Sequence, residues 1–189
     1  MVRTVGATGV EVASRVLARA FRGEPYPRHV LPAESYDLRL RSLYRHVVEV
    51  GVGSGRAEVD ELVRGVAVWV DSDRLPSISV EQAKSIYGLR FERAADCAER
   101  IARLRPPGEQ VVLETLGVDP EHRGLGVARR LLESGLARAD SRSLPVYLET
   151  ARIENVRMYE KFGFAVGRVI ELPEGGPSIW TMLRSPAGA

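Results

Sequence analysis

Apolar residues in the first half of the chain recur with two different spacings. Between residues 10 and 21 and between residues 35 and 50 they return every three or four positions, which predicts two amphipathic helices. Short apolar runs predict strands at 2–6, 56–61 and 62–70. The chain is therefore predicted to open with a strand, two helices and two neighbouring strands.

Prolines and glycines indicate where these elements end. Three prolines lie within 25–32, so we expect that this stretch cannot continue a helix. A polar, proline-containing connection covers 71–79, and a helical pattern then fills 80–104. The run Pro-Pro-Gly at 106–108 ends that helical region.

Strands and helices alternate in the second half of the chain. Strands are predicted at 110–118, 144–150, 164–172 and 179–183, and helices at 124–139 and 154–162. The order β-α-α-β-β-α-β-α-β-α-β-β defines a mixed α/β class. We expect a central mixed sheet, mostly antiparallel, with one parallel strand-helix-strand unit at 110–150.

Composition narrows the function classes. The 189 residues suit one domain, and a net charge of +2 gives no indication of a nucleic-acid partner. Cys97 is the only cysteine, and no histidines and carboxylates share metal-ligand spacing, so we expect no disulfide and no metal. No apolar run approaches the ~20 residues of a membrane span. Glu11 and the opening strand argue against a transit peptide, so a cytoplasmic protein is expected.

One glycine-bearing loop carries the chemistry that is easiest to interpret. A strand ends at Val118, and Arg123-Gly-Leu-Gly-Val-Ala128 then opens a helix. Glycines let the backbone approach a ligand closely, and the unpaired N–H groups and dipole of a helix start attract a pyrophosphate. A dinucleotide fold would need a third glycine where Arg129 stands, and the Gly-Lys-Ser/Thr of an NTPase loop is absent. A helix start without a ligand is the remaining alternative.

Two segments in the second half resemble the signatures of the GNAT superfamily of N-acetyltransferases. The loop 123–128 is similar to its Arg/Gln-x-x-Gly-x-Gly/Ala signature, and Tyr147-Leu-Glu-Thr-Ala151 followed by Asn155 and 158–164 is similar to its second signature. Within the superfamily the sequence most resembles puromycin N-acetyltransferase-like proteins. The segment 171–177 (Glu-Leu-Pro-Glu-Gly-Gly-Pro) and the later Trp180, Met182 and Arg184 carry this closer likeness.

The resemblance implies a GNAT-like fold in a single domain over residues 1–189. Residues 1–105 would form the acceptor-side half, and residues 106–189 would bind acetyl-CoA. The implied activity is transfer of an acetyl group from acetyl-CoA to the amine of a small molecule. A protein acetyltransferase acting on lysines or N-termini, and a non-catalytic acyl-CoA-binding regulatory module, are the alternatives. An apolar edge strand at the C-terminus would be compatible with a homodimer.

The same resemblance assigns roles to individual residues. The residues implied to bind the cofactor are Leu116, Gly117, Val118, Arg123, Gly124, Leu125, Gly126, Val127, Ala128, Arg129, Asn155 and Tyr159. Tyr159 would also protonate the leaving thiolate, since a phenol of pKa ~10 is a workable acid toward a thiol of pKa ~8.5. Its alternative role is core packing beside Phe162 and Phe164.

The group that deprotonates the attacking amine is left open between two carboxylates. Glu114 and Glu149 both interrupt apolar strands, and burial would raise their pKa toward a useful value. A buried carboxylate bonded to the backbone or to Arg152 is the alternative for either. The acceptor pocket is expected from aromatic residues of the first half, although most of them are expected in the core. These candidates are Phe21, Tyr26, Tyr36, Tyr44, Trp69 and Tyr87, with His29 and His46 as further possible contacts.

Overall fold

The structure, a computed structural model, describes residues 1–53, 56–74 and 77–187. Within these residues, seven strands form one sheet in the order β1-β2-β3-β4-β5-β7-β6. The strands are β1 Val2–Thr4, β2 Ala57–Asp60, β3 Gly65–Asp71, β4 Val111–Val118, β5 Val146–Thr150, β6 Ala165–Glu171 and β7 Ser178–Arg184. Only β4 and β5 run parallel among the described strands, and the other neighbours are antiparallel. The predicted mixed, mostly antiparallel sheet is therefore confirmed.

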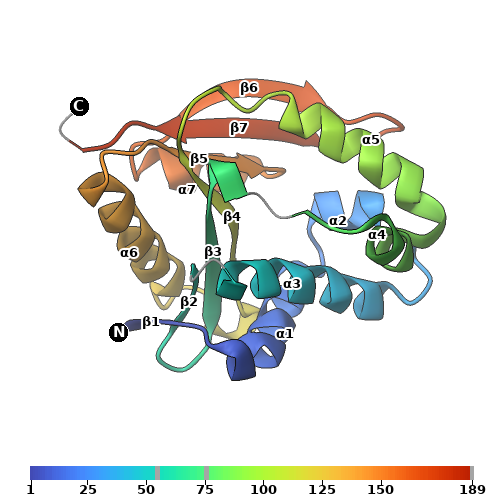
Figure 1. Cartoon of the computed structure of the whole chain (residues 1–189), viewed down its shortest axis with the longest axis horizontal. Coiled ribbons are helices and arrows are strands. Elements are labelled where there is room, and N and C mark those ends of the chain that lie inside the picture. The colour runs from blue at the N-terminus through green and yellow to red at the C-terminus, as the bar shows by residue number, and fades with distance from the viewer. Residues whose placement is uncertain (54–55, 75–76, 188–189) are drawn as a thin grey trace.

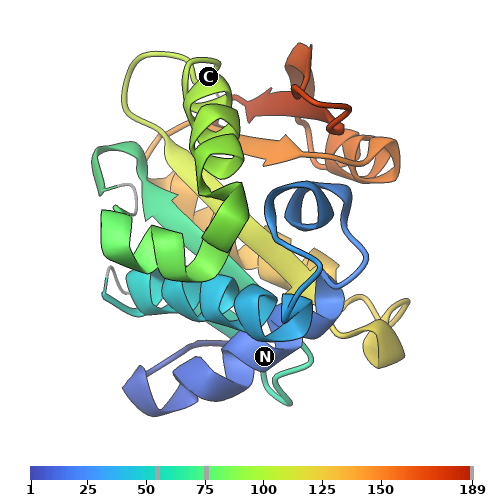
Figure 2. The same ribbon diagram turned by 90° about the vertical axis from the view of Figure 1, so that its right-hand side faces the viewer.

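Helices cover both faces of this sheet (Figures 1 and 2). The α-helices are α1 Val10–Ala20, α2 Pro25–Val30, α3 Tyr36–Gly53, α4 Val80–Tyr87, α5 Phe91–Ala102, α6 Val127–Ser141 and α7 Ile153–Glu160. Short 3-10 turns are η1 Ala7–Gly9, η2 Ser72–Arg74, η3 Gly88–Arg90 and η4 Pro120–His122. Helix α6 connects β4 to β5, which completes the parallel unit expected at 110–150.

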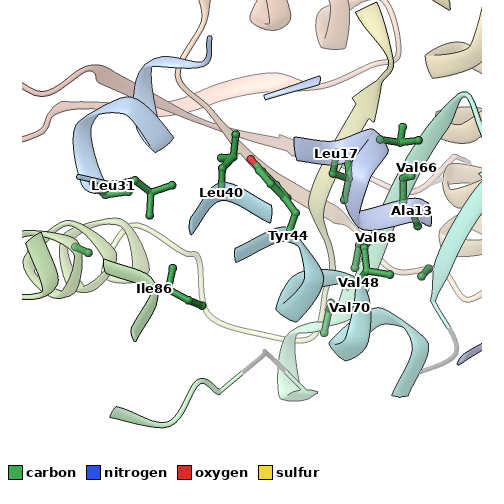
Figure 3. Close-up of a cluster of buried hydrophobic side chains, with 14 of the residues drawn as sticks. Ala13, Leu17, Leu31, Leu40, Tyr44, Val48, Val66, Val68, Val70 and Ile86 are labelled. Atoms are coloured by element: carbon green, nitrogen blue, oxygen red, sulfur yellow. The ribbon is translucent and has the colours of Figure 1, made fainter. Parts of the chain in front are cut away.

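Alternate residues of β3 divide the core into two clusters. Val66, Val68 and Val70 join side chains of α1, α3 and α4 on one face, as Figure 3 shows. Ala67 and Trp69 point to the opposite face and pack against α6 and α7. Since both faces of β3 are buried, the strand is a continuous apolar run rather than an alternating one.

The stretch 25–32 differs from its prediction, because α2 is a helix that begins with proline. Pro25 and Pro27 lie in its first turn, where a backbone N–H has no partner within a helix, so neither proline costs a hydrogen bond. The N–H of Leu31 donates to the carbonyl of Pro27 at 2.9 Å. The stretch does not continue α1, as predicted, but it forms a short helix of its own that the prediction did not include.

The C-terminal strand also differs from its prediction. β7 lies between β5 and β6, so β6 is the edge strand and the last strand of the chain is not. Val166 and Val169 of β6 are 40% and 50% exposed. The homodimer, which was based on an apolar C-terminal edge, stays a prediction.

Candidate active site

β4 and β5 separate partway along their length. Their pairing runs from Val111 opposite Val146 to Leu113 opposite Leu148 and ends there. β4 continues to Val118 while it remains paired with β3 on its other side. The backbone of 114–118 therefore faces β5 without a ladder partner from that strand, and its polar groups are available to a ligand.

Glu114 is the extra residue of a β-bulge at this point. Val68 of β3 lies opposite Thr115, and the next residue, Trp69, lies opposite Leu113, so Glu114 has no position opposite it. A bulge bends the strand and redirects the side chain. The alternation of side chains along β4 shifts accordingly, because Leu113 and Leu116 are three residues apart and yet both pack toward the α6 side of the sheet.

The loop before α6 has the geometry of an anion site. Gly124 and Gly126 have φ of +79° and +70°, which glycine adopts without strain, so α6 begins at Val127 rather than at the predicted residue 124. The N–H groups of 124–126 have no acceptor within the described part of the chain. The first N–H groups of α6 lack intrahelical partners as well, so the loop fits a pyrophosphate; we call residues 123–128 the phosphate loop.

A groove of about 670 Å³ joins this loop to the diverging strands; we call it the main groove. Its lining residues are Ala20, Phe21, Glu24, Leu116, Gly117, Val118, His122, Arg123, Gly124, Gly126, Val127, Ala128, Arg152, Glu154, Asn155, Met158 and Tyr159. Of the residues predicted to bind the cofactor, Leu125 and Arg129 do not line it. Leu125 is 54% exposed, and Arg129 pairs with Glu133 at 2.9 Å on the surface of α6.

Asn155 and Tyr159 lie on α7 and both line the main groove. The amide of Asn155 donates to the Thr150 hydroxyl at 3.1 Å, which fixes its orientation at the end of β5. Tyr159 is 7% exposed and packs edge-on against Phe164, with ring centroids 5.6 Å apart. Burial raises the pKa of Tyr159, so the phenol keeps its proton at neutral pH. Tyr159 therefore packs in the core and also lines the main groove, so core packing does not exclude a role in the groove.

Glu114 and Glu149 come together with two residues that the sequence did not single out for a role. We call Glu114, Glu149, Arg105 and Tyr147 the glutamate–arginine cluster. Arg105 donates from Nη2 to Glu149 Oε1 at 3.5 Å, and its guanidinium carbon lies 5.3 Å from the centre of the Tyr147 ring. Burial raises the pKa of Glu149 to about 7, although Arg105 opposes the shift, and burial also raises the pKa of Glu114. Arg105 stands in an ordinary loop after α5, so no sequence signal pointed to it.

A second recess, of about 460 Å³, adjoins the main groove and is lined by five arginines: Arg19, Arg22, Arg28, Arg123 and Arg152. Three of them bond carbonyls at the end of α1. Arg123 donates to Ala20, Arg28 to Arg22 and Arg152 to Gly23, at 3.2, 2.9 and 3.1 Å. These contacts hold the α1–α2 turn beside the phosphate loop. Sequence reasoning missed this recess because its arginines come from four separate segments.

The aromatic residues proposed for the acceptor pocket lie in different parts of the structure. Phe21 lines the main groove. Burial raises the pKa of Tyr26 and of Tyr87, and the charge of nearby Glu114 raises both further. Trp69 is fully buried on the α6 side, away from these residues, so it is no acceptor wall. The rings of Tyr44 and Phe21 pack with their centroids 4.8 Å apart and their planes tilted by 34°.

The three histidines lie in three different places. His122 lines the main groove, whereas His46 lies 3.3 Å from the Gln82 amide on the outer helices. His29 lies against the turn at Gly176. Among the described residues no three His, Cys, Asp or Glu side chains gather as metal ligands, and no helix there is long and apolar enough to cross a membrane.

Comparison with known sequences matches the second half of the chain. Residues 90–164 match the Acetyltransferase (GNAT) family. A mycothiol acetyltransferase from Propionibacterium freudenreichii is 34% identical over 101 residues, which cover 52% of this chain and 30% of that protein. One from Thermobispora bispora is 45% identical over 87 residues, covering 44% of this chain and 28% of that protein. The chain thus spans less than a third of the length of these curated relatives.

Comparison with solved structures matches the whole chain. A protein from Corynebacterium glutamicum, described as histone acetyltransferase HPA2 and related acetyltransferase, has a TM-score of 0.78 and 25% identity, covering 100% of this chain and 97% of that one. Polyamine N-acetyltransferase from Drosophila melanogaster has a TM-score of 0.64 and 17% identity, covering 98% and 99%. The latter likeness shows the fold.

The diverging strands, the phosphate loop and these matches define the class of fold: residues 90–164 match the GNAT family of acetyltransferases, and the chain has a GNAT fold. Its fold is the single-domain GNAT fold that the sequence predicted. Two curated relatives that match are named mycothiol acetyltransferases, so the closer likeness to puromycin N-acetyltransferases stays a prediction.

Proposed function

We propose that this protein transfers an acetyl group from acetyl-CoA to the amine of a small molecule, by direct attack of the amine on the thioester. The observation that carries the proposal is the main groove, which runs from the unpaired amides of the phosphate loop to Asn155 and Tyr159 beside the free edge of β4. Residues 106–189 supply most of this groove, and residues 1–105 supply its α1 side.

The residues present fit acetyl-CoA. The N–H groups of the phosphate loop would hold its pyrophosphate, and the unpaired backbone of Leu116 and Val118 would bond its pantetheine arm. Gly117 faces α1, where a Cβ would meet Leu17 and Phe21 at 2.8 Å, so glycine lets α1 pack tightly behind this strand. When bound, the thioester supplies an activated acetyl carbonyl.

The glutamate–arginine cluster supplies the base. An amine must lose a proton before it attacks, and a carboxyl group with a pKa of about 7 is partly ionised at neutral pH and basic enough to accept that proton. Glu149 has this property, and Glu114, on the bulge beside it, reinforces the negative charge. Both glutamates stay in the proposal, because neighbouring carboxyls that share charge titrate as a pair.

Tyr159 supplies the acid. Its phenol is protonated, buried and part of the groove wall, so it would donate its proton to the sulfur as the C–S bond breaks. Asn155, fixed by Thr150, would orient the pantetheine end. The glutamates of β4 and β5 would thus remove a proton from the amine, and Tyr159 of α7 would deliver a proton to the sulfur.

Two experiments test the proposal. Calorimetric titration should show micromolar binding of acetyl-CoA, with NAD and ATP as controls that bind weakly. The test panel contains puromycin, small primary amines and, for comparison, lysine-containing peptides. Purified protein with acetyl-CoA should then acetylate at least one of the small-molecule amines. A panel that gives product only with lysine-containing peptides would favour a protein acetyltransferase. Binding without any transfer would favour a regulatory acyl-CoA-binding module.

A further inference from the structure

Two arginines of the second recess, which we call the arginine-lined recess, have no carboxylate partner. Within residues 1–53, 56–74 and 77–187, Arg28 and Arg123 donate to backbone carbonyls and form no ion pair. The pairs made by the other three arginines are Arg19 with Asp119 and Glu121 at 3.2 and 2.8 Å, Arg22 with Asp37 at 2.7 Å, and Arg152 with Glu24 at 2.7 Å. Of these carboxylates only Glu24 lines the recess, so its wall is strongly positive.

The bonds to the backbone use only part of each free guanidinium. Arg123 donates from Nη2 to the carbonyl of Ala20, and Arg28 donates from Nε to the carbonyl of Arg22. These carbonyls lie at the end of α1, where a helix leaves carbonyls unpaired, so both arginines cap the helix. A guanidinium carries five N–H donors, and most donors of both side chains make no bond within the described residues. They are therefore available to a ligand in the recess.

Arg28 is held in position by contacts with its own surroundings. Its guanidinium carbon lies 3.9 Å from the centre of the Tyr36 ring. The Tyr36 hydroxyl donates to the same Arg22 carbonyl at 3.2 Å, which ties the start of α3 to the α1–α2 turn. A stacked and bonded guanidinium loses little further freedom when it binds an oxyanion. The α2 side of the recess is thus preorganised.

The charge of the recess favours a doubly charged anion. Two guanidinium groups without carboxylate partners match a ligand with two negative charges better than a ligand with one. A phosphomonoester carries about −1.5 to −2 at pH 7, whereas a carboxylate or a phosphodiester carries a single charge. Guanidinium groups also match the spacing of phosphate oxygens, which they can bond with two parallel N–H groups. A phosphomonoester is therefore the chemical class that fits best.

We propose that the arginine-lined recess is a second anion site, which binds a phosphomonoester through Arg28 and Arg123. It differs from the site for the pyrophosphate, which backbone amides of the phosphate loop would hold. The recess and the main groove share Ala20, Glu24, Arg123 and Arg152, so the bound group would lie next to the cofactor. The phosphomonoester has two possible sources: the phosphate on the ribose of CoA, or a free phosphorylated metabolite. Only the first source rests on the proposed function.

The first arm of the test compares two cofactors that differ in one group. Acetyl-dephospho-CoA lacks only the ribose phosphomonoester of acetyl-CoA. If the cofactor is the source, calorimetry should show that the wild type binds acetyl-CoA about 10–100-fold more tightly, the usual value of a charged hydrogen bond. Arg28→Gln should reduce this preference about tenfold and leave the affinity for acetyl-dephospho-CoA unchanged. Arg28→Lys keeps the charge without the fork and should retain part of the preference.

The second arm tests a free phosphomonoester. Glycerol 3-phosphate is titrated into the protein with and without acetyl-dephospho-CoA, and glycerol is the uncharged control. If a metabolite is the source, the wild type should bind both cofactors equally and should bind glycerol 3-phosphate but not glycerol. Arg28→Gln should weaken the binding of glycerol 3-phosphate about tenfold. Arg28 is the residue to replace because Arg123 belongs to the phosphate loop.

An arginine on α1 provides the matched control. Arg15 is 56% exposed, pairs with Glu11 and does not line the recess, so Arg15→Gln should leave every affinity unchanged. Thermal unfolding is measured for each variant, because Arg28 also supports the α1–α2 turn. A purely structural role of Arg28 would lower stability and weaken both cofactors by the same factor. That result would overturn the inference.

The outcomes separate this inference from the proposed function. Equal binding of the two cofactors, with no binding of glycerol 3-phosphate at millimolar concentration, would overturn the inference and leave the acetyltransferase intact. A preference for acetyl-CoA that survives in Arg28→Gln would overturn it as well. Binding of neither cofactor, together with Arg28-dependent binding of glycerol 3-phosphate, would remove the proposed function and support the second anion site.

Discussion

Replacing Glu149 by glutamine is expected to stabilise the protein in neutral and alkaline solution while removing activity. The folded protein raises the pKa of this carboxyl to about 7 from an ordinary value of 4.5, so its charged form is disfavoured by folding. The difference of roughly 2.5 pKa units, at roughly 1.36 kcal/mol per unit, is worth about 3 kcal/mol. Since the side chain is 26% exposed, solvent screening makes this value an upper bound.

The sign of the pH dependence follows from the raised pKa. Below pH 4.5 the carboxyl is protonated in both the folded and the unfolded state, so Glu149 costs no stability there. Between pH 4.5 and about 7 the unfolded chain ionises first, and wild type loses stability that the glutamine variant keeps. At about pH 8 the full advantage of Glu149→Gln should be present. The kcat/KM of the wild type should rise with pH through about 7, as the base loses its proton.

Urea unfolding at several pH values between about 4.5 and about 8.5 measures this directly. The free-energy difference between Glu149→Gln and wild type should grow from near zero to a few kcal/mol across that interval. Glu109→Gln is the control, because Glu109 is exposed and makes no ion pair with the described residues. A difference that is constant with pH would refute the assignment of Glu149 as a carboxyl with a raised pKa.

Three further substitutions test separate parts of the structure. Tyr159→Phe should lower kcat by ~10²–10⁴ with little change in acetyl-CoA affinity, and an unchanged kcat would remove the phenol from the acid role. Gly126→Ala places a side chain at a φ of +70°, at a cost of roughly 1–2 kcal/mol, and should weaken acetyl-CoA binding in calorimetry; an unaffected affinity would contradict the loop geometry. Gly135→Ala would put a Cβ 2.0 Å from the Trp69 ring, so thermal unfolding should show a loss of about 3 kcal/mol or more, whereas Gly6→Ala, with no atom within 4 Å, should be nearly neutral.

Periodicity was sufficient for most of the fold. The apolar spacing of α1 and α3 and the alternation of strands and helices after residue 110 correspond to the observed elements within a few residues. It failed at α2, where the number of prolines outweighed their position in the first turn. Periodicity also carries no information on the order of the last two strands in the sheet. Whether β7 inserts beside β5 or lies at the edge is decided by packing against distant strands, which local patterns do not contain.

In the candidate site, too, the features that form contiguous motifs were predicted and those that depend on distant contacts were not. The phosphate loop, Asn155 and Tyr159 are contiguous motifs, and the structure brings them to one groove. Glu114 and Glu149 were noticed because charged residues interrupt apolar strands. Arg105 was missed, because its importance comes from lying beside Glu149, 44 residues further along the chain. The arginine-lined recess was missed for the same reason. Its arginines are brought together only by the fold, so no regular spacing in the sequence indicates them.

One local irregularity connects the fold to the chemistry. The bulge at Glu114 coincides with the end of pairing between β4 and β5, so the strand bends where its neighbour leaves it. Beyond this point the backbone of β4 has no partner from β5, and in the proposed function it would bond the pantetheine arm. Glu114, on the bulge, lies near Glu149 at the same place. In the proposed function, this irregularity would provide both the opening for the thioester and the acidic environment for the amine.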